Sequence, residues 1–143
     1  MECEMPLINS NPEEMKEIFE SVKTIAILGL SPDESKASNM VAKYLQNAGY
    51  KIVPVYPKED EILGEKVYRS LEEIPFEIDM VDIFRKPNAF DAIADACIRR
   101  GDIKVFWGQL VLVNNAAAQK AKDAGMKVVQ NYCTKLEHMA LMS

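Results

Sequence analysis

The sequence predicts a three-layer, Rossmann-like α/β fold, with helices on both faces of a five-stranded, mainly parallel sheet. One observation behind this prediction is an unbroken apolar segment, Thr24 to Leu28, that runs into Gly29 without polar alternation. Such a run is typical of a strand buried on both faces. Another is that apolar strand-like segments alternate along the chain with amphipathic stretches of helical spacing, which indicates parallel strands joined by right-handed crossovers.

A third observation is a joint that recurs along the chain. Helical stretches end at Gly49, Gly101 and Gly125, and in each case a short apolar strand is expected to begin within two or three residues. Glycine suits the left-handed position that follows a helix. The recurrence therefore predicts repeated helix-to-strand units.

A first helix is predicted over about residues 11–22, packed on the rest of the fold. Asn11 provides a capping side chain, Pro12 fits the first helical position, and Glu13 and Glu14 lie at the positive end of the helix dipole. An apolar stripe follows at helical spacing and should face the sheet: Met15, Ile18, Phe19 and Val22.

Residues 78–84 predict a further strand, and Pro87 begins the helix after it. Asn114 or Asn115 is expected to cap the next helix. Residues 59–77 are irregular, although the capping box that starts at Ser70 predicts one short helix there. No low-complexity linker or tandem repeat interrupts the chain, so we expect a single domain over residues 1–143.

Composition limits the classes of function. A net charge of −5 gives no general attraction to nucleic acid or to an anionic membrane, so we expect neither as a partner. The N-terminus lacks the pattern of a signal peptide, which predicts a cytoplasmic protein. The three cysteines, Cys3, Cys97 and Cys133, form no C-x-x-C pair, so neither a disulfide scaffold nor a cysteine zinc site is expected.

The turn after the central strand is the first candidate site. A buried strand, a glycine turn and a helix N-terminus aim unpaired N–H groups at one point and so favour an anion. We expect the turn to hold a pyrophosphate through Gly29, Leu30, Ser31 and Pro32. The dinucleotide fingerprint is matched only in part, because Ser31 and Glu34 stand where its second and third glycines would be.

The other candidates follow the remaining strands, because ligands of open α/β sheets gather at the carboxyl ends of the strands. Several are basic and would form one positive rim suited to a ligand with more than one phosphate. Lys58 stands near the end of the second strand, where an NAD site needs an acid, and this favours a phosphorylated ribose, as in NADP or coenzyme A. The candidates are Lys36, Tyr56, Pro57, Lys58, Phe84, Arg85, Lys86, Gln109, Asn131 and Cys133.

Simpler interpretations stand beside these. A charged residue just past a strand is often a solvated loop residue, Trp107 is more often a core or rim aromatic than a stacking platform, and Gln109 could be a turn residue. A structural or solvent-exposed role is favoured for His138, and an inert, partly buried thiol for Cys133. No P-loop, nucleophile elbow or H-E-x-x-H motif occurs, so the sequence predicts a binding site without evident catalytic residues.

The ordered set of these segments resembles the small stand-alone CoA-binding proteins, which are similar to the N-terminal CoA-binding lobe of the succinyl-CoA synthetase α chain. The resemblance extends from about Ser21 to His138 and rests on the glycine turn, residues 53–58, 62–71, 81–87 and the segment from Cys133. It implies a Rossmann-like domain that binds coenzyme A or an acyl-CoA. It does not imply ligase activity, because the ligases use a phosphorylated histidine in a second domain.

The resemblance also implies roles for the candidates. The Gly29–Pro32 turn would hold the pyrophosphate, Lys36 and Lys58 would neutralise phosphates, and residues 84–87 would border the adenosine. Asn131 and Cys133 would lie near the thiol end. An NADP-linked oxidoreductase remains the alternative, and an activity that resides in a partner enzyme, or a homo-oligomer, remains open.

Overall fold

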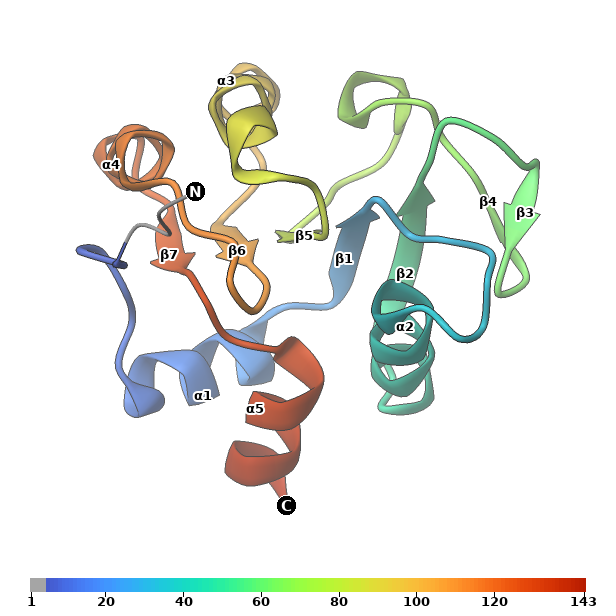
Figure 1. Cartoon of the computed structure of the whole chain (residues 1–143), viewed down its shortest axis with the longest axis horizontal. Coiled ribbons are helices and arrows are strands. Elements are labelled where there is room, and N and C mark those ends of the chain that lie inside the picture. Colours follow the sequence, from blue (N-terminus) through green and yellow to red (C-terminus); the bar gives the residue numbers. More distant parts are fainter. Residues whose placement is uncertain (1–4) are drawn as a thin grey trace.

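The computed structural model of the protein describes residues 5–143, and a five-stranded sheet lies at its centre (Figure 1). All neighbouring strands of this sheet are parallel, in the order β2-β1-β5-β6-β7. Their bounds are Thr24–Leu28 for β1, Lys51–Val55 for β2, Met80–Ile83 for β5, Val105–Gly108 for β6 and Lys127–Val129 for β7. The predicted three-layer α/β class is confirmed.

The strand order reverses at β1. From β1 the chain first adds β2 on one side, and it then crosses to place β5 on the other side. The carboxyl ends of β1 and β5 therefore form the topological switch point, where open α/β sheets bind their ligands. Gly29 and Phe84 directly follow these two strands.

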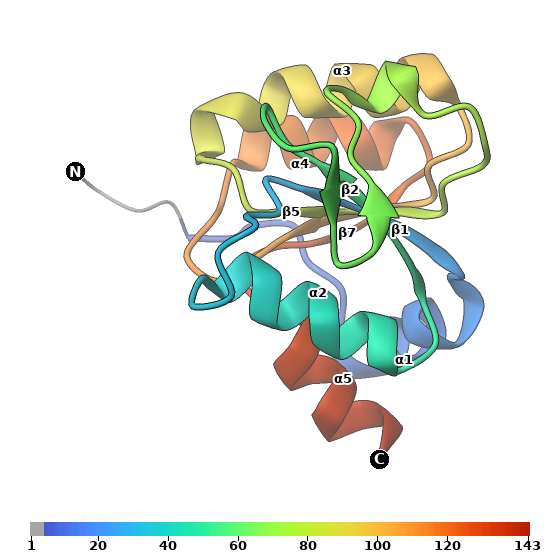
Figure 2. The ribbon, with the colours of Figure 1, turned by 90° about the vertical axis from the view of Figure 1, so that its right-hand side faces the viewer.

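Helices cover both faces of the sheet (Figures 1 and 2). One face carries α1 (Pro12–Ser21), α2 (Ala37–Asn47) and α5 (Thr134–Met142), and the other carries α3 (Phe90–Arg100) and α4 (Asn115–Asp123). Alternate residues of the buried strands supply the two cores. On β1, for example, Ala26 and Leu28 belong to one core, while Ile25 and Ile27 belong to the other.

The predicted helix starts are present at Asn11 and Asn114, whereas the start predicted at Pro87 differs. The Asn11 side chain accepts from the Glu14 N–H at 2.9 Å, and the Glu14 carboxylate accepts from the Asn11 N–H at 2.9 Å, which completes a capping box. Asn114, rather than Asn115, caps α4 by accepting from the Ala117 N–H. A 3₁₀ turn over Pro87–Ala89 precedes α3, so the α-helix itself begins at Phe90.

The three glycine joints are also present, and Gly49, Gly101 and Gly125 all have positive φ. Two of the strands begin two residues later, at Lys51 and Lys127. After Gly101 the strand begins later than predicted, at Val105. The intervening Asp102 carboxylate accepts from the Ile78 N–H and from the Arg100 guanidinium.

The irregular stretch after β2 contains more than the short helix predicted there. It includes the two-stranded antiparallel pair of β3 (Glu61–Ile62) and β4 (Glu65–Lys66), followed by a 3₁₀ helix over Leu71–Glu73. Ser70 makes no side-chain capping bond to that helix. The segment after β4 lies against the outer edge of β2, because the Tyr56 N–H donates to the Tyr68 carbonyl and the Tyr68 N–H to the Pro54 carbonyl.

The C-terminal tail forms the helix α5, which the sequence did not define. His138 lies on it among the rings of Phe19, Tyr44 and Tyr50, and its Nδ1 is 2.8 Å from the Tyr44 hydroxyl. Burial lowers the pKa of His138. Trp107 is fully buried against Phe19 in the same core, so His138 and Trp107 both help to fix α5 and α1 on the sheet.

Two cysteines lie within the described residues. Cys97 is buried in α3, and burial raises the pKa of its thiol to about 12. Cys133 is half-buried at the start of α5. Cys3 lies outside residues 5–143. In that described range, no helix is long and apolar enough to cross a lipid bilayer.

Candidate functional site

The turn after β1 is built around a glycine in the left-handed conformation. Gly29 has a φ of +89°, and its N–H donates to the Val55 carbonyl at 2.9 Å. A Cβ at this position would lie 3.2 Å from the Phe84 carbonyl oxygen and 3.3 Å from Arg85 Nε. The backbones after β1 and β5 thus approach closely at the switch point, and only glycine fits this approach without strain.

The next residues form a rigid turn that leads into α2. The Ser31 N–H donates to Ser38 Oγ at 3.0 Å, and the Ser31 carbonyl accepts from Asn39 Nδ2 at 2.9 Å. Asp33 is tied to Ser35, whose hydroxyl and backbone N–H both donate to its carboxylate and lower its pKa. The Ser31 amide is therefore already paired within the protein.

The N-terminus of α2 is open by comparison. Lys36 is its N-cap and makes no side-chain capping bond, and the first turn of the helix contains no acidic residue. An uncapped first turn leaves backbone N–H groups available to an anion. Lys36 itself is exposed beside them. Pro32 is exposed as well, whereas Leu30 is fully buried and anchors the turn in the core.

The predicted basic side chains lie in the loops at the carboxyl ends of β1, β2 and β5. Lys58 and Lys86 are exposed, and Arg85 is half-buried. Among residues 5–143, none of Lys36, Lys58, Arg85 and Lys86 takes part in an ion pair within 4.0 Å. Positive groups that form no ion pair with other described residues suit a ligand with several negative charges.

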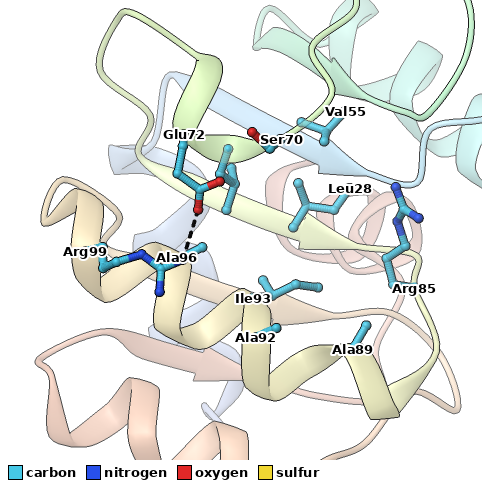
Figure 3. Close-up of a pocket in the computed structure, with 11 residues that line it drawn as sticks. Leu28, Val55, Ser70, Glu72, Arg85, Ala89, Ala92, Ile93, Ala96 and Arg99 are labelled. Carbon is cyan, nitrogen blue, oxygen red and sulfur yellow. Dashed lines mark hydrogen bonds and ion pairs between the residues drawn. The ribbon is translucent and has the colours of Figure 1, made fainter.

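A pocket of about 370 Å³ opens beside this turn (Figure 3). Leu28 and Val55, the last residues of β1 and β2, form one wall, and α3 presents Ile93 and small alanine side chains from the other. Arg85 lies at one end, and an ion pair between Arg99 and Glu72, 3.1 Å apart, lies at the other. The pocket has the size and the largely apolar lining of a small-molecule site.

Arg85 alone among the predicted site residues lines this pocket; sequence reasoning missed the rest of its lining. A signal was present in α3 and the turn before it, where Ala89, Ala92, Ile93 and Ala96 recur at helical spacing on one face. The opposite side comes from Ser70, Leu71 and Glu72, in the stretch whose course the sequence did not define.

Polar residues at the ends of β6 and β7 are bound to one another instead. Gln109 is only 4% exposed, and its Nε2 donates to the Asp82 carboxylate and, at 2.8 Å, to Thr134 Oγ1. Thr134 Oγ1 in turn donates to Asp82 Oδ2 at 2.8 Å. Burial raises the pKa of the Asp82 carboxyl to about 7, against the lowering effect of these two hydrogen bonds.

Asn131 and Cys133 lie at the same end of the sheet. Asn131 has a φ of +63°, and its Oδ1 accepts from the Val111 N–H at 2.7 Å, which joins the loops after β6 and β7. Trp107 Nε1 donates to the Tyr132 carbonyl at 2.8 Å. Cys133 is the half-buried N-cap of α5. Gln109 and Asn131 are therefore occupied within the protein, while Cys133 remains accessible.

The predicted residues thus form two groups along the carboxyl edge. The turn after β1 and the basic loops after β2 and β5 surround the switch point, and Gln109, Asn131 and Cys133 lie across the sheet at β6 and β7. Three strand spacings of about 4.8 Å separate β1 from β7, a distance of about 14 Å. Within the described part of the chain, no group of histidine, cysteine or carboxylate side chains could hold a metal ion.

The fold is that of a doubly wound α/β protein, with a switch point of the kind at which such proteins bind their ligands. Comparison with known proteins identifies the family: residues 23–139 match the model of the CoA binding domain, and the chain belongs to that family. It is 42% identical over 130 residues to the uncharacterized protein YneT of Bacillus subtilis, and this match covers 91% of the chain and 96% of YneT.

A hypothetical protein from Pyrococcus horikoshii has the same fold, with a TM-score of 0.91, 38% identity and complete coverage of both chains. An ADP-forming acetate–CoA ligase of Methanocaldococcus jannaschii is 33% identical over 79 residues. That match covers 55% of this chain but only 11% of the ligase. The chain is thus related to the CoA-binding region of these ligases and spans a small part of their length.

Proposed function

We propose that this protein binds coenzyme A or an acyl-CoA at the carboxyl edge of its sheet. The observation that supports this most strongly is the close approach of Gly29 to Phe84 and Arg85 at the switch point, in a chain that belongs to the CoA binding domain family. The pyrophosphate would lie against the Gly29–Pro32 turn. The open N-terminus of α2 and the side chain of Lys36 would supply the positive potential.

The adenosine would occupy the pocket between β1, β2 and α3. Its apolar walls suit a purine ring, and Arg85 borders it from the loop after β5. Phe84, the preceding residue, packs against the core on the other face of the sheet. An arginine can stack on an aromatic ring or pair with a phosphate, and Arg85 is free of ion pairs with other described residues. Tyr56 and Pro57 would line the approach to this pocket from the loop after β2.

The ribose 3′-phosphate would meet Lys58 and Lys86. Both side chains are exposed in loops that flank the switch point, so they can reach a phosphate without a large desolvation cost. A lysine near the end of the second strand would also disfavour the unphosphorylated ribose of NAD. The site would therefore distinguish CoA from its 3′-dephospho form.

The pantetheine arm would run along the edge from β1 towards β7. An extended pantetheine has a length similar to the roughly 14 Å between these strands. It would pass Gln109 at the end of β6 and bring the thiol or thioester near Asn131 and Cys133. The function proposed for this chain is binding, and the matched region is 11% of the length of the related ligase.

Titration calorimetry with CoA and 3′-dephospho-CoA tests this proposal, with NADPH as the competing ligand. CoA should bind more tightly than its dephospho form, and NADPH should not bind. In a thermal-unfolding assay, CoA at a hundred times its Kd should add about 2.7 kcal/mol of stability. Equal binding of CoA and dephospho-CoA would contradict the role of the lysines, and stabilisation by NADPH without CoA would support an oxidoreductase instead.

Gly29→Ala is the matched variant for the pyrophosphate turn. The new methyl group would press on Phe84 and Arg85 at a positive φ, so we expect CoA affinity to fall about tenfold or more. Gly125→Ala is the control, because it has a similar φ of +95° but nothing within 4 Å of the new Cβ. The control should lose stability without losing affinity; equal losses of affinity in both variants would contradict the role of the turn.

A further inference from the structure

One guanidinium group holds together the loop that follows β2. Arg69 Nη1 donates to three carbonyl oxygens of that loop, those of Tyr56 at 3.0 Å, Lys58 at 3.0 Å and Glu59 at 2.8 Å. Three carbonyl dipoles that converge on one point repel one another unless a positive group lies between them. The loop conformation therefore depends on the arginine.

The loop has little else to hold it. Its ends are fixed by the bond from the Tyr56 N–H to the Tyr68 carbonyl and by the bond from the Val67 N–H to the Asp60 carbonyl. Between them, Glu59 has a φ of +68°, a left-handed conformation that is unfavourable for a residue with a side chain. Without Arg69, we expect residues 57–59 to leave this conformation.

Arg69 is itself well anchored. It follows Tyr68, which pairs with Val55 beside β2, and its own N–H donates to Glu73 Oε2 at 2.8 Å. Its side chain is 44% exposed, and its second terminal nitrogen, Nη2, lies 4.0 Å from the Asp60 carboxylate. The arginine thus connects the ordered segment before the 3₁₀ helix to the loop that carries Lys58.

We infer that Arg69 is a positioning residue that holds Lys58 where it recognises the 3′-phosphate of the nucleotide. This inference rests on the proposed function, because it takes CoA as the ligand and Lys58 as the group that meets the phosphate. Arg69 acts through the loop backbone, since its Nη1 is occupied by the three carbonyl groups. It determines specificity for a 3′-phosphorylated ligand, while the pyrophosphate turn supplies affinity common to both forms.

The test is the ratio of the Kd values for 3′-dephospho-CoA and CoA, measured by calorimetry in Arg69→Met and Lys58→Met. Loss of a charge-assisted contact predicts that each variant lowers this preference about tenfold. The affinity for dephospho-CoA should stay within about twofold of the wild type, which also shows that the variants are folded. If Arg69→Met does not fold, Arg69→Gln replaces it, with a smaller change in the same direction.

A double-mutant cycle separates positioning from a direct charge effect. In the Lys58→Met background, Arg69→Met should cause no further loss of preference, because the lysine through which it acts is gone. Lys104→Met removes a positive charge at the opposite edge of the sheet and should leave the ratio unchanged. Arg69→Lys keeps a cation near the carbonyl groups and should restore most of the preference.

The possible failures can be told apart. A wild type that binds neither ligand, or both equally, overturns the proposed function and with it this inference. If the wild type prefers CoA and Lys58→Met loses that preference, but Arg69→Met keeps it, the positioning role alone is wrong. A further loss from Arg69→Met in the Lys58→Met background would show that the arginine acts by its own charge, which also overturns the inference.

Discussion

The two halves of the carboxyl edge differ in how their polar groups are used. Around β1, β2 and β5, the side chains of Lys36, Lys58, Arg85 and Lys86 form no ion pairs with other described residues. Around β6 and β7, Gln109 is hydrogen-bonded to Asp82 and Thr134, and Asn131 to the Val111 N–H. One half leaves its polar groups available to a ligand, while the other uses them to hold the chain.

The difference teaches that position at a strand end does not by itself make a polar residue a ligand contact. Buried polar groups need partners, and Gln109 and Thr134 provide them for Asp82, a carboxyl with no exposure to solvent. The exposed lysine side chains are solvated by water and therefore need no hydrogen-bond partner within the protein. The β6–β7 half therefore forms a fixed wall, and the β1–β5 half remains free to accept negative charge.

The substitution with the largest expected effect on stability is Asp82→Asn, in the half of the edge whose polar groups are paired. The pKa of Asp82 is raised from 3.8 to about 7, so the folded state retains a proton that the unfolded state releases between about pH 4 and pH 7. The wild type should therefore lose stability as pH rises through that range, by an amount on the order of 4 kcal/mol. The asparagine variant should lack this loss. Urea unfolding at pH 4.5, 6 and 8 measures the difference.

Glu20→Gln, an exposed change on α1, is the control for Asp82 and should follow the wild type at each pH. At pH 8, Asp82→Asn should be more stable than the wild type, because it buries no charge. If the free energy of unfolding depends on pH in the same way in the wild type and in Asp82→Asn, the pKa of Asp82 is not raised by folding. The β6–β7 half would then not depend on a neutral Asp82.

Gly108→Ala, at the end of β6, should cause an intermediate loss of stability. The added Cβ would lie 2.9 Å from both the Leu112 carbonyl oxygen and Phe90 Cε2, so the loop or the ring must shift. Overpacking of this kind costs about 1–3 kcal/mol, and chemical denaturation should show a loss in that range. Gly64→Ala meets nothing within 4 Å but has a φ of +76°, so it measures the cost of backbone strain without new contacts. A Gly108→Ala variant as stable as the wild type would mean that the contacts at Gly108 relax freely.

The smallest expected change in stability is that of Lys86→Met, on the open half. An exposed side chain without an ion pair contributes little to folding, so the free energy of unfolding should change by less than about 0.5 kcal/mol. The affinity for CoA should fall several-fold, and its dependence on salt should weaken, because one phosphate contact is lost. Lys16→Met on α1 is the control for charge. If both variants bind CoA like the wild type, Lys86 lies outside the site.

Much of the fold could be predicted because its signals are local. The apolar run of β1, the capping side chain of Asn11 and the glycines after three helices each depend on neighbouring residues, and the structure contains them all. The helix α5 was not defined, because its apolar residues contact α1 and α2, which lie far away in the sequence. The pair of β3 and β4 was missed because two-residue strands carry almost no periodicity.

The candidate site could be predicted only in outline. The rule that ligands bind past the carboxyl ends of strands selected loops that the structure brings to one end of the sheet, but it could not tell the exposed Lys58 from the buried Gln109. Lys58 is exposed, whereas Gln109 meets Asp82 and Thr134 from other elements in the interior. The role of Arg69 was not visible either, since its bonds run to backbone carbonyl groups 10 to 13 residues away.

The sequence by itself determined the α/β class, the position of the glycine turn and the presence of basic residues after the strands, because these follow from short-range periodicity and backbone preference. The tertiary structure alone decided that Ala89, Ala92 and Ile93 face Leu28 and Val55 across a pocket, and that Asp82 is fully buried. Cavities and buried charges arise where distant segments meet. Their energies depend on which atoms are excluded from water, and tertiary packing alone determines which atoms those are.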